Sequence, residues 1–336
     1  MIKLLYIGNN LRIKTSNISA IQTLGPLFEK EGFKVYYASS KVNKVLRLLD
    51  MLWTCLSLST RVDVVCIDTY STSNFYYAWA VSQLCRALKL KYVPILHGGN
   101  LPYRLEHSPR LSKQIFRHAH INVSPSLYFV DEFKKKGFEN VVFIPNSIEI
   151  ENYPFRERSF KTGKLLWVRS FSKIYNPELA IQILADLKHE PFLTELCMVG
   201  PDSDGSMVNV KERADQLGCE VSFPGKLTKQ EWIGLSEDFD IFINTTNYDN
   251  MPVSVIEAMA LGLLVISTNV GGIPYLISEG QDGILVPPKD VSAFTDAIKM
   301  AISNSENSKR MTHQARQKVE AYNWNHVKKQ WLEALT

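Results

Sequence analysis

The stretch from Asn247 to Gly262, NYDNMPVSVIEAMALG, places two carboxylates eight positions apart around the start of an apolar segment. Pro252 is typical of a first helical position and Gly262 of a helix end, so Asp249 stands just outside the predicted helix and Glu257 within it. A helix that is apolar on nearly every side is usually buried. A buried carboxylate without a partner is costly, so Glu257 is predicted to lie in or beside a cavity.

The predicted helix start would also attract an anion. Its backbone N–H groups at Met251, Val253 and Ser254 lack partners within the helix, and the helix dipole favours negative charge there. With Asp249 and Glu257 on either side, this site could hold an anionic centre flanked by hydroxyls, which is the layout of a nucleoside diphosphate sugar. The alternative is structural: Asp249 caps the helix and Glu257 pairs with a basic side chain.

The elements that must position these residues follow a regular pattern. Short apolar runs alternate with amphipathic segments, first at 3–8, 34–39, 63–68, 91–99, 121–126 and 140–146, then at 165–170, 195–200, 220–225, 240–246, 263–269 and 283–288. This alternation predicts an α/β fold with parallel sheets covered by helices on both faces. Because the pattern restarts after the polar, turn-forming residues 146–154, we expect two doubly wound domains, over 1–150 and 151–320. A helix over about 321–336 carries two tryptophans on one face and needs a docking surface.

Composition agrees with an ordinary globular protein of two domains. The chain has 336 residues, which is more than one hydrophobic core usually organises. Of these residues 45% are apolar and 21% are charged, as in ordinary globular proteins. The net charge of +4 suits an anionic small ligand or a membrane surface. The short Lys134–Lys136 run is its only basic run, so nucleic acid is not an expected partner.

Cysteine usage and hydropathy predict a cytoplasmic location. The five cysteines lie singly, without a C-x-x-C pair, and read as reduced, buried residues. The N-terminal run 1–8 is too short for a signal peptide and is expected to lead straight into a domain. Apolar stretches fall short of the roughly 20 residues that a membrane span needs.

The segment 249–274, DNMPVSVIEAMALGLLVISTNVGGIP, resembles the E-x7-E block of family 4 retaining glycosyltransferases, with Asp in place of the first Glu. Four further blocks resemble the same family in the right order: HGGN (97–100), FIPNSIEI (143–150), MVGPDSDG (198–205) and SFPGKLTKQEW (222–232). The resemblance implies the GT-B fold, in which two Rossmann-like doubly wound domains face a central cleft. It also implies that the first domain, completed by the C-terminal helix, binds the acceptor and that the second binds the nucleotide sugar.

The resemblance assigns roles to the residues of this block. Glu257 would hydrogen-bond the ribose of the donor, and Asp249 would hold the transferred sugar. The Asp side chain is one methylene shorter than Glu, which implies a shifted sugar contact and not lost activity. The remaining donor-binding residues of the block are Asn250, Met251, Pro252 and Val253.

A second element, LWVRSFSKIYNPELAI (166–181), resembles the family's G-R-L-x-x-x-K-G element. In the family its Arg and Lys neutralise the leaving diphosphate, whose charge develops in the transition state. Here Val168 replaces the Gly before Arg169, and Lys173 arrives one position early. For Lys173 the alternative is a solvated lysine in a loop.

Three further groups complete the candidate site. His97 ends an apolar run and precedes Gly98 and Gly99, which let backbone approach a ligand closely, and in the family this His contacts the donor sugar or the reacting centre. Gly8 and Asn9 follow the first run, in a loop that in the family lies against the diphosphate or the acceptor. By the same resemblance Gly225 and Lys226 belong with the donor-binding residues.

Other cofactors are not expected. Gly8 begins no G-x-G-x-x-G fingerprint, and VGPDSDGS (199–206) lacks the end of a P-loop, which argues against nicotinamide and ATP sites. Asp238 and Asp240 mimic a D-x-D metal motif, but Asp240 leads into an apolar run and a GT-B fold needs no metal at such a motif. Gly271 and Gly272 are predicted to form a tight turn beside the donor site.

Two segments in the first half remain open to two interpretations. Residues 41–56 are amphipathic, and we prefer packing against the first sheet over docking on a membrane surface. The residues aligned on one face of this segment are Val42, Val45, Leu49, Leu52 and Leu56, with Lys41, Lys44 and Arg47 nearby. The aromatic segment 68–79 could line the acceptor cleft or form a core helix with its leading loop.

The resulting hypothesis is a retaining hexosyltransferase-type glycosyltransferase. It would move a sugar from a UDP- or GDP-sugar to a hydroxyl of a saccharide or lipid-linked acceptor, in surface polysaccharide or glycoconjugate synthesis, without a metal or further cofactor. The resemblance implies front-face chemistry, in which the departing phosphate helps to take the proton, and allows a peripheral position on the inner face of a membrane. The alternatives are a GT-B sugar-nucleotide epimerase and a catalytically weak nucleotide-sugar-binding subunit.

Overall fold

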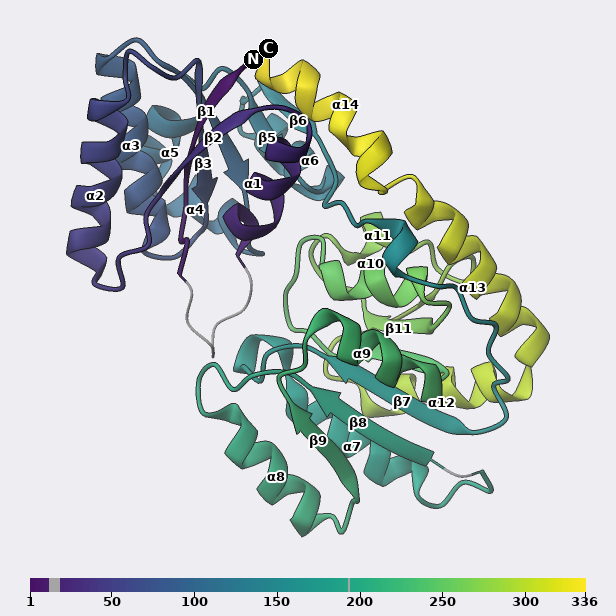
Figure 1. Cartoon of the computed structure of the whole chain (residues 1–336). Helices are drawn as coiled ribbons and strands as arrows, with labels where there is room; N and C mark the ends of the chain where they lie inside the picture. Colours follow the sequence, from purple (N-terminus) through teal and green to yellow (C-terminus); the bar gives the residue numbers. More distant parts are fainter. Residues whose placement is uncertain (12–18, 193) are drawn as a thin grey trace. The chain divides into compact units, whose positions relative to one another are not determined.

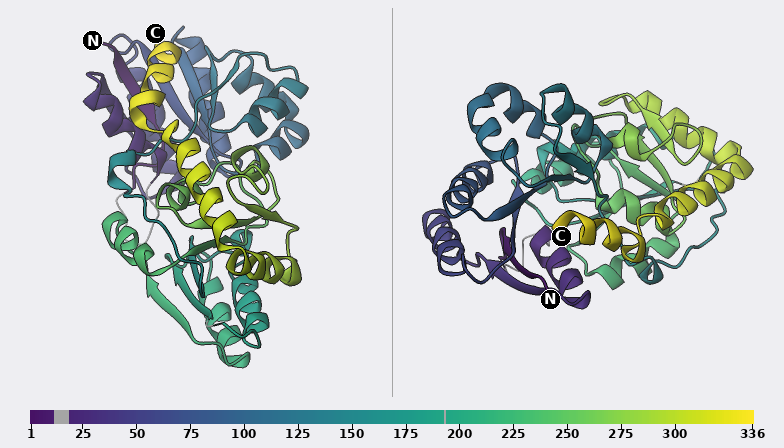
Figure 2. Two further views of the ribbon diagram at one scale, coloured as in Figure 1. Left: turned by 90° about the vertical axis from the view of Figure 1, so that its right-hand side faces the viewer. Right: turned by 90° about the horizontal axis from the view of Figure 1, so that it is seen from above.

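The computed structural model describes residues 1–11, 19–192 and 194–336. The chain forms two compact units, which Figure 1 and Figure 2 show in three views. Unit 1 comprises Met1–Pro145 and Gln330–Thr336, and unit 2 comprises Asn146–Lys329. The division after Pro145 lies a few residues before the boundary at 150 that the sequence pattern suggested.

Unit 1 is built on a six-stranded parallel sheet in the order β2-β1-β3-β4-β5-β6. Its strands are β1 (Lys3–Ile7), β2 (Lys34–Ala38), β3 (Val64–Thr69), β4 (Lys91–Leu96), β5 (Asn122–Ser124) and β6 (Val141–Phe143). Its helices are α1 (Ala20–Lys30), α2 (Lys44–Ser57), α3 (Asn74–Ala87), α4 (Leu101–His107), α5 (Pro109–Phe116) and α6 (Leu127–Lys135). Each strand coincides with one of the predicted apolar runs, except that β3 extends one residue past its run to Thr69. The agreement follows because a strand covered on both faces needs apolar side chains on both.

Unit 2 repeats the plan with the strand order β12-β11-β10-β7-β8-β9. Its strands are β7 (Gly163–Val168), β8 (Thr194–Val199), β9 (Val221–Gly225), β10 (Ile241–Asn244), β11 (Leu264–Thr268) and β12 (Ile284–Val286). Its helices are α7 (Pro177–Leu187), α8 (Ser206–Gln216), α9 (Lys229–Leu235), α10 (Val253–Ala260), α11 (Ile273–Leu276), α12 (Val291–Ser303) and α13 (Ser305–Glu320). The prediction of two parallel, helix-covered sheets is confirmed. Because consecutive strands run outward from β7 in one direction and from β10 in the other, ligands are expected beside the carboxyl ends of β7 and β10.

The last helix, α14 (Trp324–Leu335), contributes residues to both units. Within unit 1 its Trp331 packs edge-to-face on Phe28 of α1, with ring centroids 5.3 Å apart. Trp331 is 4% exposed. The tryptophan-bearing face therefore finds the docking surface that its composition requires.

The sequence favoured packing of residues 41–56 against the first sheet, and for the face on which their apolar side chains align this interpretation is wrong. Helix α2 packs on the core of unit 1 through Met51 and Cys55, which are buried. Most of the aligned apolar side chains lie on the opposite side of the helix and are exposed, among them Val45 at 67% and Leu49 at 56%. Periodicity located an apolar stripe correctly, but a second and narrower stripe makes the contact with the sheet.

The same structure bears on membrane spanning and on the aromatic segment. Among the described residues, every helix is too short or too polar to cross a bilayer. The aromatic segment 68–79 supplies the first turns of α3, and Phe75 and Ala78 are fully buried there. Its leading residues line a pocket, as the next subsection describes.

Candidate functional site

In unit 2 the helix that prompted the site begins one residue later than predicted. Pro252 has extended backbone angles, φ −69° and ψ 121°, and precedes α10 as its N-cap instead of occupying the first helical position. Its missing N–H is still harmless there, because the N–H of an N-cap residue donates no helical hydrogen bond. The helix ends at the predicted place, where Gly262 adopts φ +79° and a Cβ would meet the Arg156 carbonyl oxygen at 2.4 Å.

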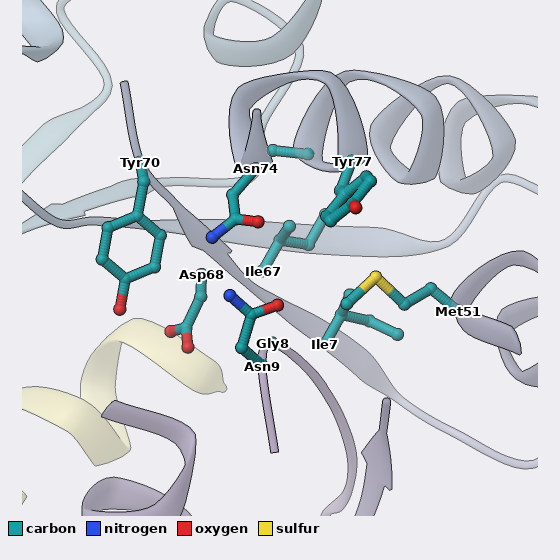
Figure 3. A pocket seen from close by; sticks show the side chains of 10 residues that line it. Ile7, Gly8, Asn9, Met51, Ile67, Asp68, Tyr70, Asn74 and Tyr77 are labelled. Atoms are coloured by element: carbon teal, nitrogen blue, oxygen red, sulfur yellow. The ribbon is translucent and has the colours of Figure 1, made fainter. Parts of the chain in front are cut away.

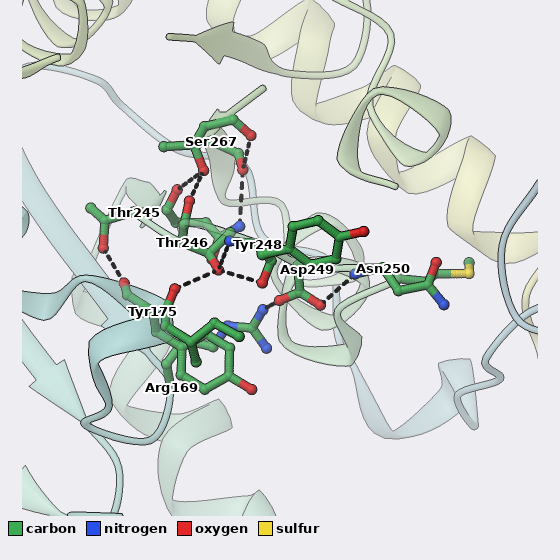
Figure 4. A network of polar contacts seen from close by, with 12 residues as sticks. Arg169, Tyr175, Thr245, Thr246, Tyr248, Asp249, Asn250 and Ser267 are labelled. Atoms are coloured by element: carbon green, nitrogen blue, oxygen red, sulfur yellow. Dashed lines mark hydrogen bonds and ion pairs between the residues drawn. The ribbon is translucent and has the colours of Figure 1, made fainter. Parts of the chain in front are cut away.

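Asp249 and Arg169 form an ion pair at the carboxyl edge of the second sheet (Figure 4). Arg169 follows β7 and Asp249 lies five residues beyond β10, so the pair stands where the strand order reverses. The two side chains are 12% and 15% exposed, and the Arg169 guanidinium lies 4.5 Å from the ring centroid of Tyr175. Burial lowers the pKa of Arg169 below its usual value.

The carboxylate of Asp249 is also held by its own backbone. Its Oδ1 accepts a hydrogen bond from the Asn250 N–H at 2.8 Å. Since α10 has no side-chain cap, the hypothesis that Asp249 caps this helix is wrong. Asn250 and Met251 are buried and Val253 is partly exposed. The segment from Asn250 to Val253 thus connects the ion pair directly to the helix start.

Glu257 is 4% exposed and holds two partners from other elements. Tyr153 donates its hydroxyl to Glu257 Oε1 at 2.7 Å, and Lys229 Nζ forms an ion pair with the same oxygen. Burial and the Glu257 carboxylate raise the pKa of Tyr153 well above its usual value. The structural alternative for Glu257, pairing with a basic side chain, is therefore what the structure shows. The Lys229 side chain is 40% exposed, so this partner can move into solvent.

Sequence reasoning missed Lys229 and Tyr153. A signal for Lys229 was present in TKQE (228–231), which forms a capping box in which Thr228 and Glu231 satisfy each other's backbone N–H groups. That box fixes Lys229 at the first position of α9. No local pattern marked Tyr153, whose partner lies 104 residues away.

Hydrogen bonds of its backbone hold Lys173 at the carboxyl edge of the second sheet. The Lys173 N–H and the Ser172 hydroxyl both donate to Asp204 Oδ2 at 3.0 Å, and Asn247 Nδ2 donates to the Lys173 carbonyl at 2.9 Å. The loops after β7, β8 and β10 are thereby tied together. The Lys173 side chain itself is exposed.

Gly225 and Lys226 stand beside these loops. Gly225 ends β9 with φ +78°, and its carbonyl accepts from the Gly200 N–H at 2.9 Å. A Cβ on Gly200 would overlap the Arg169 carbonyl oxygen at 1.7 Å, so this glycine lets the loop after β8 touch the loop that carries Arg169. Lys226 follows immediately and is exposed.

The turn at Gly271 and Gly272 supports the backbone of the acidic segment. The Gly272 N–H donates to the Asp249 carbonyl at 2.9 Å, and a Cβ on Gly272 would meet the Asn250 carbonyl oxygen at 2.0 Å. This close approach requires glycine, although the Gly272 backbone is helical in type at φ −87°.

We expect Gly272→Ala to lower the free energy of unfolding by about 1–3 kcal/mol, because the added methyl group must displace the backbone at Asn250. Gly234→Ala is the matched control, since it lies in α9 and its Cβ would meet nothing within 4 Å. It should leave stability unchanged or raise it. Urea titration followed by circular dichroism measures both, and equal midpoints for the two variants would contradict the packing argument.

In unit 1, His97 follows β4 and contacts a residue that the sequence did not single out. Its Nε2 lies 2.8 Å from Asp68 Oδ1, and the Tyr6 hydroxyl donates to the same oxygen at 3.0 Å. The ring of Tyr70 stacks on the imidazole with centroids 5.0 Å apart. The signal for Asp68 was its place near the end of the run 63–68, since β3 and β4 are neighbours in the sheet.

A small pocket, partly open to solvent and with room for about one water molecule, lies beside this pair (Figure 3). Asp68, Tyr70, Asn74, Gly8 and Asn9 supply its polar wall. The second carboxylate oxygen, Asp68 Oδ2, is buried and has no hydrogen-bond partner among the described residues. A Cβ at position 8 would meet that oxygen at 2.4 Å, which explains the glycine. The pocket therefore offers an acceptor oxygen and amide groups to a small polar ligand.

The remaining candidates in unit 1 lie on the same sheet edge. Gly98 adopts φ +74° directly after His97, and Gly99 follows it, half-buried. Asn9 Oδ1 accepts from the Arg47 guanidinium at 3.1 Å. Strands β1 and β4 lie on either side of β3, so their carboxyl ends are at the same edge of the sheet. The candidates that follow these two ends are Gly8, Asn9, His97 and Gly99.

The D-x-D sequence at 238–240 does not gather ligands for a metal. Asp238 ends a short 3-10 helix, and Asp240 is largely buried with its N–H bonded to the Lys164 carbonyl at 3.1 Å. Burial raises the pKa of Asp240. Within the described ranges, no group of three or more His, Cys, Asp or Glu residues could hold a metal ion.

Comparison with known proteins identifies the second half of the chain. A family model described as glycosyl transferases group 1 matches residues 149–318. A glycogen synthase from Mycobacterium tuberculosis is 24% identical over 201 residues, which cover 59% of this chain and 49% of that protein. The amylovoran biosynthesis glycosyltransferase AmsK from Erwinia amylovora is 26% identical over 249 residues, covering 69% of this chain and 61% of that protein. The matches thus span about half to three fifths of these relatives.

Solved structures match over both units. Anabaena HepE in complex with UDP-glucose has a TM-score of 0.79 at 17% identity and covers 100% of this chain and 99% of that one. The sucrose-phosphate synthase from Thermosynechococcus elongatus has a TM-score of 0.81 at 15% identity, covering 99% and 98%. These likenesses confirm the predicted GT-B fold of two Rossmann-like domains. With its family model matched over half of its length, the chain belongs to the group 1 glycosyltransferases.

Proposed function

We propose that this glycosyltransferase is a retaining enzyme of family 4 in which the E-x7-E motif is replaced by D-x7-E, at Asp249 and Glu257. It moves a hexose from a UDP- or GDP-sugar to a hydroxyl of a saccharide or lipid-linked acceptor in surface polysaccharide or glycoconjugate synthesis. Similar proteins support this class, since AmsK is named for amylovoran biosynthesis and HepE was solved with UDP-glucose. No metal takes part in the proposed reaction.

The ion pair of Arg169 and Asp249 carries the proposal. It stands at the carboxyl ends of β7 and β10, next to the start of α10. A diphosphate placed there would meet the Arg169 cation and the free N–H groups of the helix start. The Asp249 carboxylate, relieved of its cation, would accept from hydroxyls of the transferred sugar. One residue pair thus serves both halves of a sugar diphosphate.

Glu257 is assigned to the ribose. Its carboxylate is buried, oriented by Tyr153, and can accept hydrogen bonds from two neighbouring hydroxyls. The partly exposed Lys229 now neutralises it and would move aside or bridge to the nucleotide. Because hydrogen bonds to a charged group are about twice as strong as neutral ones, this contact would contribute strongly to nucleotide affinity.

Unit 1 is assigned to the acceptor. The pocket beside Asp68 offers a carboxylate oxygen that has no hydrogen-bond partner among the described residues and can accept from a hydroxyl. The other oxygen of Asp68 holds His97 Nε2 and thereby fixes the orientation and tautomer of the imidazole. In this assignment His97 contacts the reacting sugar, and Asp68 is its positioning residue.

We expect Asp68→Asn to lower kcat for transfer by about 10- to 100-fold, because the amide no longer fixes the His97 tautomer. The KM for the nucleotide sugar should stay nearly constant, since unit 2 is unchanged. Asp63→Asn is the control: this acid lies one residue before β3 and, in the described part of the chain, accepts from the exposed Lys3 N–H at 2.7 Å. A normal kcat in Asp68→Asn would remove Asp68 from the assigned role.

The donor is tested by calorimetry and thermal shift with UDP, GDP, ADP and their sugars. A ligand at 100 times its Kd raises the free energy of unfolding by about 2.7 kcal/mol, which thermal shift detects easily. We expect one nucleotide class to stabilise the parent protein. In Asp249→Ala the stabilisation by the nucleotide sugar should be smaller than in the parent, whereas the stabilisation by the free nucleotide should be the same. If no nucleotide binds, the donor assignment is wrong.

Transfer itself is tested with the donor so identified and a panel of saccharide and polyprenyl-linked acceptors. Proton NMR of the product reports the anomeric configuration, which the proposal expects to be that of the donor. An epimerised nucleotide sugar released without acceptor would instead indicate the epimerase alternative.

A further inference from the structure

Helix α2 carries an apolar face that unit 1 leaves exposed. The residues of this face, called the α2 face below, are Val42, Val45, Leu46, Leu49, Trp53 and Leu56, exposed by 66%, 67%, 56%, 56%, 69% and 47%. The five within α2 follow one another at one, three, four and three residues, which puts them on one side of the helix, and Val42 lies two residues before its start. Trp53 lies in the middle of this stripe and is the most exposed of the six. A large exposed apolar patch usually marks an interaction site.

The surface around the α2 face is basic. Helices α2 and α3 pack together, as do α3 and α5, so the three form one layer (Figure 1, Figure 2). This layer contains Asp50 as its acidic residue and five basic ones: Lys44, Arg47, Arg86, Arg110 and Lys113. All of these bases except Arg47 are exposed, and Lys41 is exposed just before α2 begins.

Charge is divided unequally between the two units. Unit 1 has 19 lysines and arginines and 10 aspartates and glutamates, hence +9, whereas unit 2 has 19 and 24, hence −5. The two values add to the chain's +4. A mild overall charge thus conceals a strongly basic unit 1, and the exposed apolar helix belongs to that unit.

We propose that the α2 face docks unit 1 on an anionic lipid bilayer, with α2 lying in the plane of the interface. An interfacial helix buries its apolar face to the depth of the headgroups and acyl chains and gains from basic residues near anionic lipids. An exposed tryptophan suits this environment, because its ring is apolar and its N–H remains polar. A second copy of the chain suits the face less well, since pairing two such surfaces brings two units of +9 together.

The inner side of the same helix reaches the candidate acceptor pocket. Met51 of α2 lines that pocket with Asn9 and Asp68 (Figure 3), and the Arg47 guanidinium donates to Asn9 Oδ1 at 3.1 Å. A bilayer in contact with α2 would therefore lie one helix diameter from the pocket. Docking in itself does not depend on the proposed function; that it presents a lipid-linked acceptor to this pocket does.

Co-sedimentation of the full chain with vesicles tests the docking. The probes are vesicles of phosphatidylcholine alone and with phosphatidylglycerol added, at about 0.1 M salt, where the Debye length is about 10 Å. We expect binding to the anionic vesicles at least tenfold tighter than to the neutral ones, and weakening as salt rises. The double variant Leu49→Gln/Trp53→Gln should bind at least tenfold more weakly, because it removes two apolar side chains from the interface.

The matched control is Val208→Gln/Met300→Gln, which changes two exposed apolar residues of unit 2 at 58% and 47% exposure and should bind as the parent does. Circular dichroism and thermal midpoints establish that all variants fold. Three outcomes overturn the docking: no binding to anionic vesicles, equal binding by the α2 double variant, or self-association that this variant abolishes while vesicles are ignored. Nucleotide-sugar binding and transfer to a soluble acceptor are measured on the same variants, so failure of docking is distinct from failure of the proposed function.

Discussion

Replacing Arg169 with alanine is expected to lower kcat for glycosyl transfer by about 100- to 1,000-fold. In the proposed site its guanidinium faces the diphosphate, whose negative charge grows as the sugar leaves. The cation is already in position, held beside Asp249 and against the ring of Tyr175 in a largely buried place. Such a fixed charge stabilises the transition state without reorganisation. Single-turnover rates with saturating donor measure the effect directly.

Three further variants separate the effect of the Arg169 charge from that of its packing. Arg169→Lys keeps the charge and loses the planar fork, so its kcat should fall between those of the parent and the alanine variant. Arg156→Ala is the control, since its ion pair with Glu237 is exposed, at 55% and 56%, and such pairs contribute little. Because Arg169→Ala leaves Asp249 without its cation, the double variant Arg169→Ala/Asp249→Asn restores charge balance and checks the fold. A kcat within threefold of the parent in a folded Arg169→Ala would refute the assignment.

Replacing Glu257 with alanine is expected to weaken nucleotide binding by about 100-fold. Two hydrogen bonds from ribose hydroxyls to a buried carboxylate would be lost, each contributing about 1.5–3 kcal/mol, and part of that loss is recovered by water. Calorimetric Kd values for the free nucleotide measure the change. The sugar is absent from this ligand, so the result concerns the ribose contact alone.

The partners of Glu257 provide the controls. Lys229→Met keeps the aliphatic stem and removes the competing ammonium, and we expect the Kd to stay constant or to decrease. Tyr153→Phe removes one hydrogen bond to the carboxylate and should raise the Kd only a few-fold. Glu237→Ala alters an exposed acid of the same unit and should have no effect. If binding survives Glu257→Ala and disappears in Lys229→Met, the nucleotide is held by the lysine and the ribose assignment is wrong.

The architecture could be predicted from the sequence because it depends on patterns within short stretches of residues. Strands covered on both faces are short, continuous apolar runs, and each of the twelve described strands overlaps a predicted run, with β3, β7 and β8 extending one or two residues beyond theirs. The restart of the pattern after residues 146–154 indicated a second sheet. The position directly after a strand then supported His97, since the carboxyl ends of parallel strands share one edge, whereas the family resemblance nominated Arg169.

Only the tertiary structure decided which of these residues have partners. His97 contacts Asp68 across β3 and β4, Arg169 contacts Asp249 across β7 and β10, and Glu257 contacts Lys229 from α9. These pairings depend on strand order and on where each loop folds back, which no short window of sequence contains.

Helix α2 shows most clearly which features the sequence determined and which depended on tertiary packing. Its 3.6-residue periodicity determined that apolar side chains share one side, and that remains true in the structure. Which side faces the sheet was decided by packing, because Met51 and Cys55 fit the space beside β-strands and α3 while the longer stripe does not. Periodicity fixes the relative directions of side chains around a helix axis; only the neighbours that surround the helix fix which direction is inward.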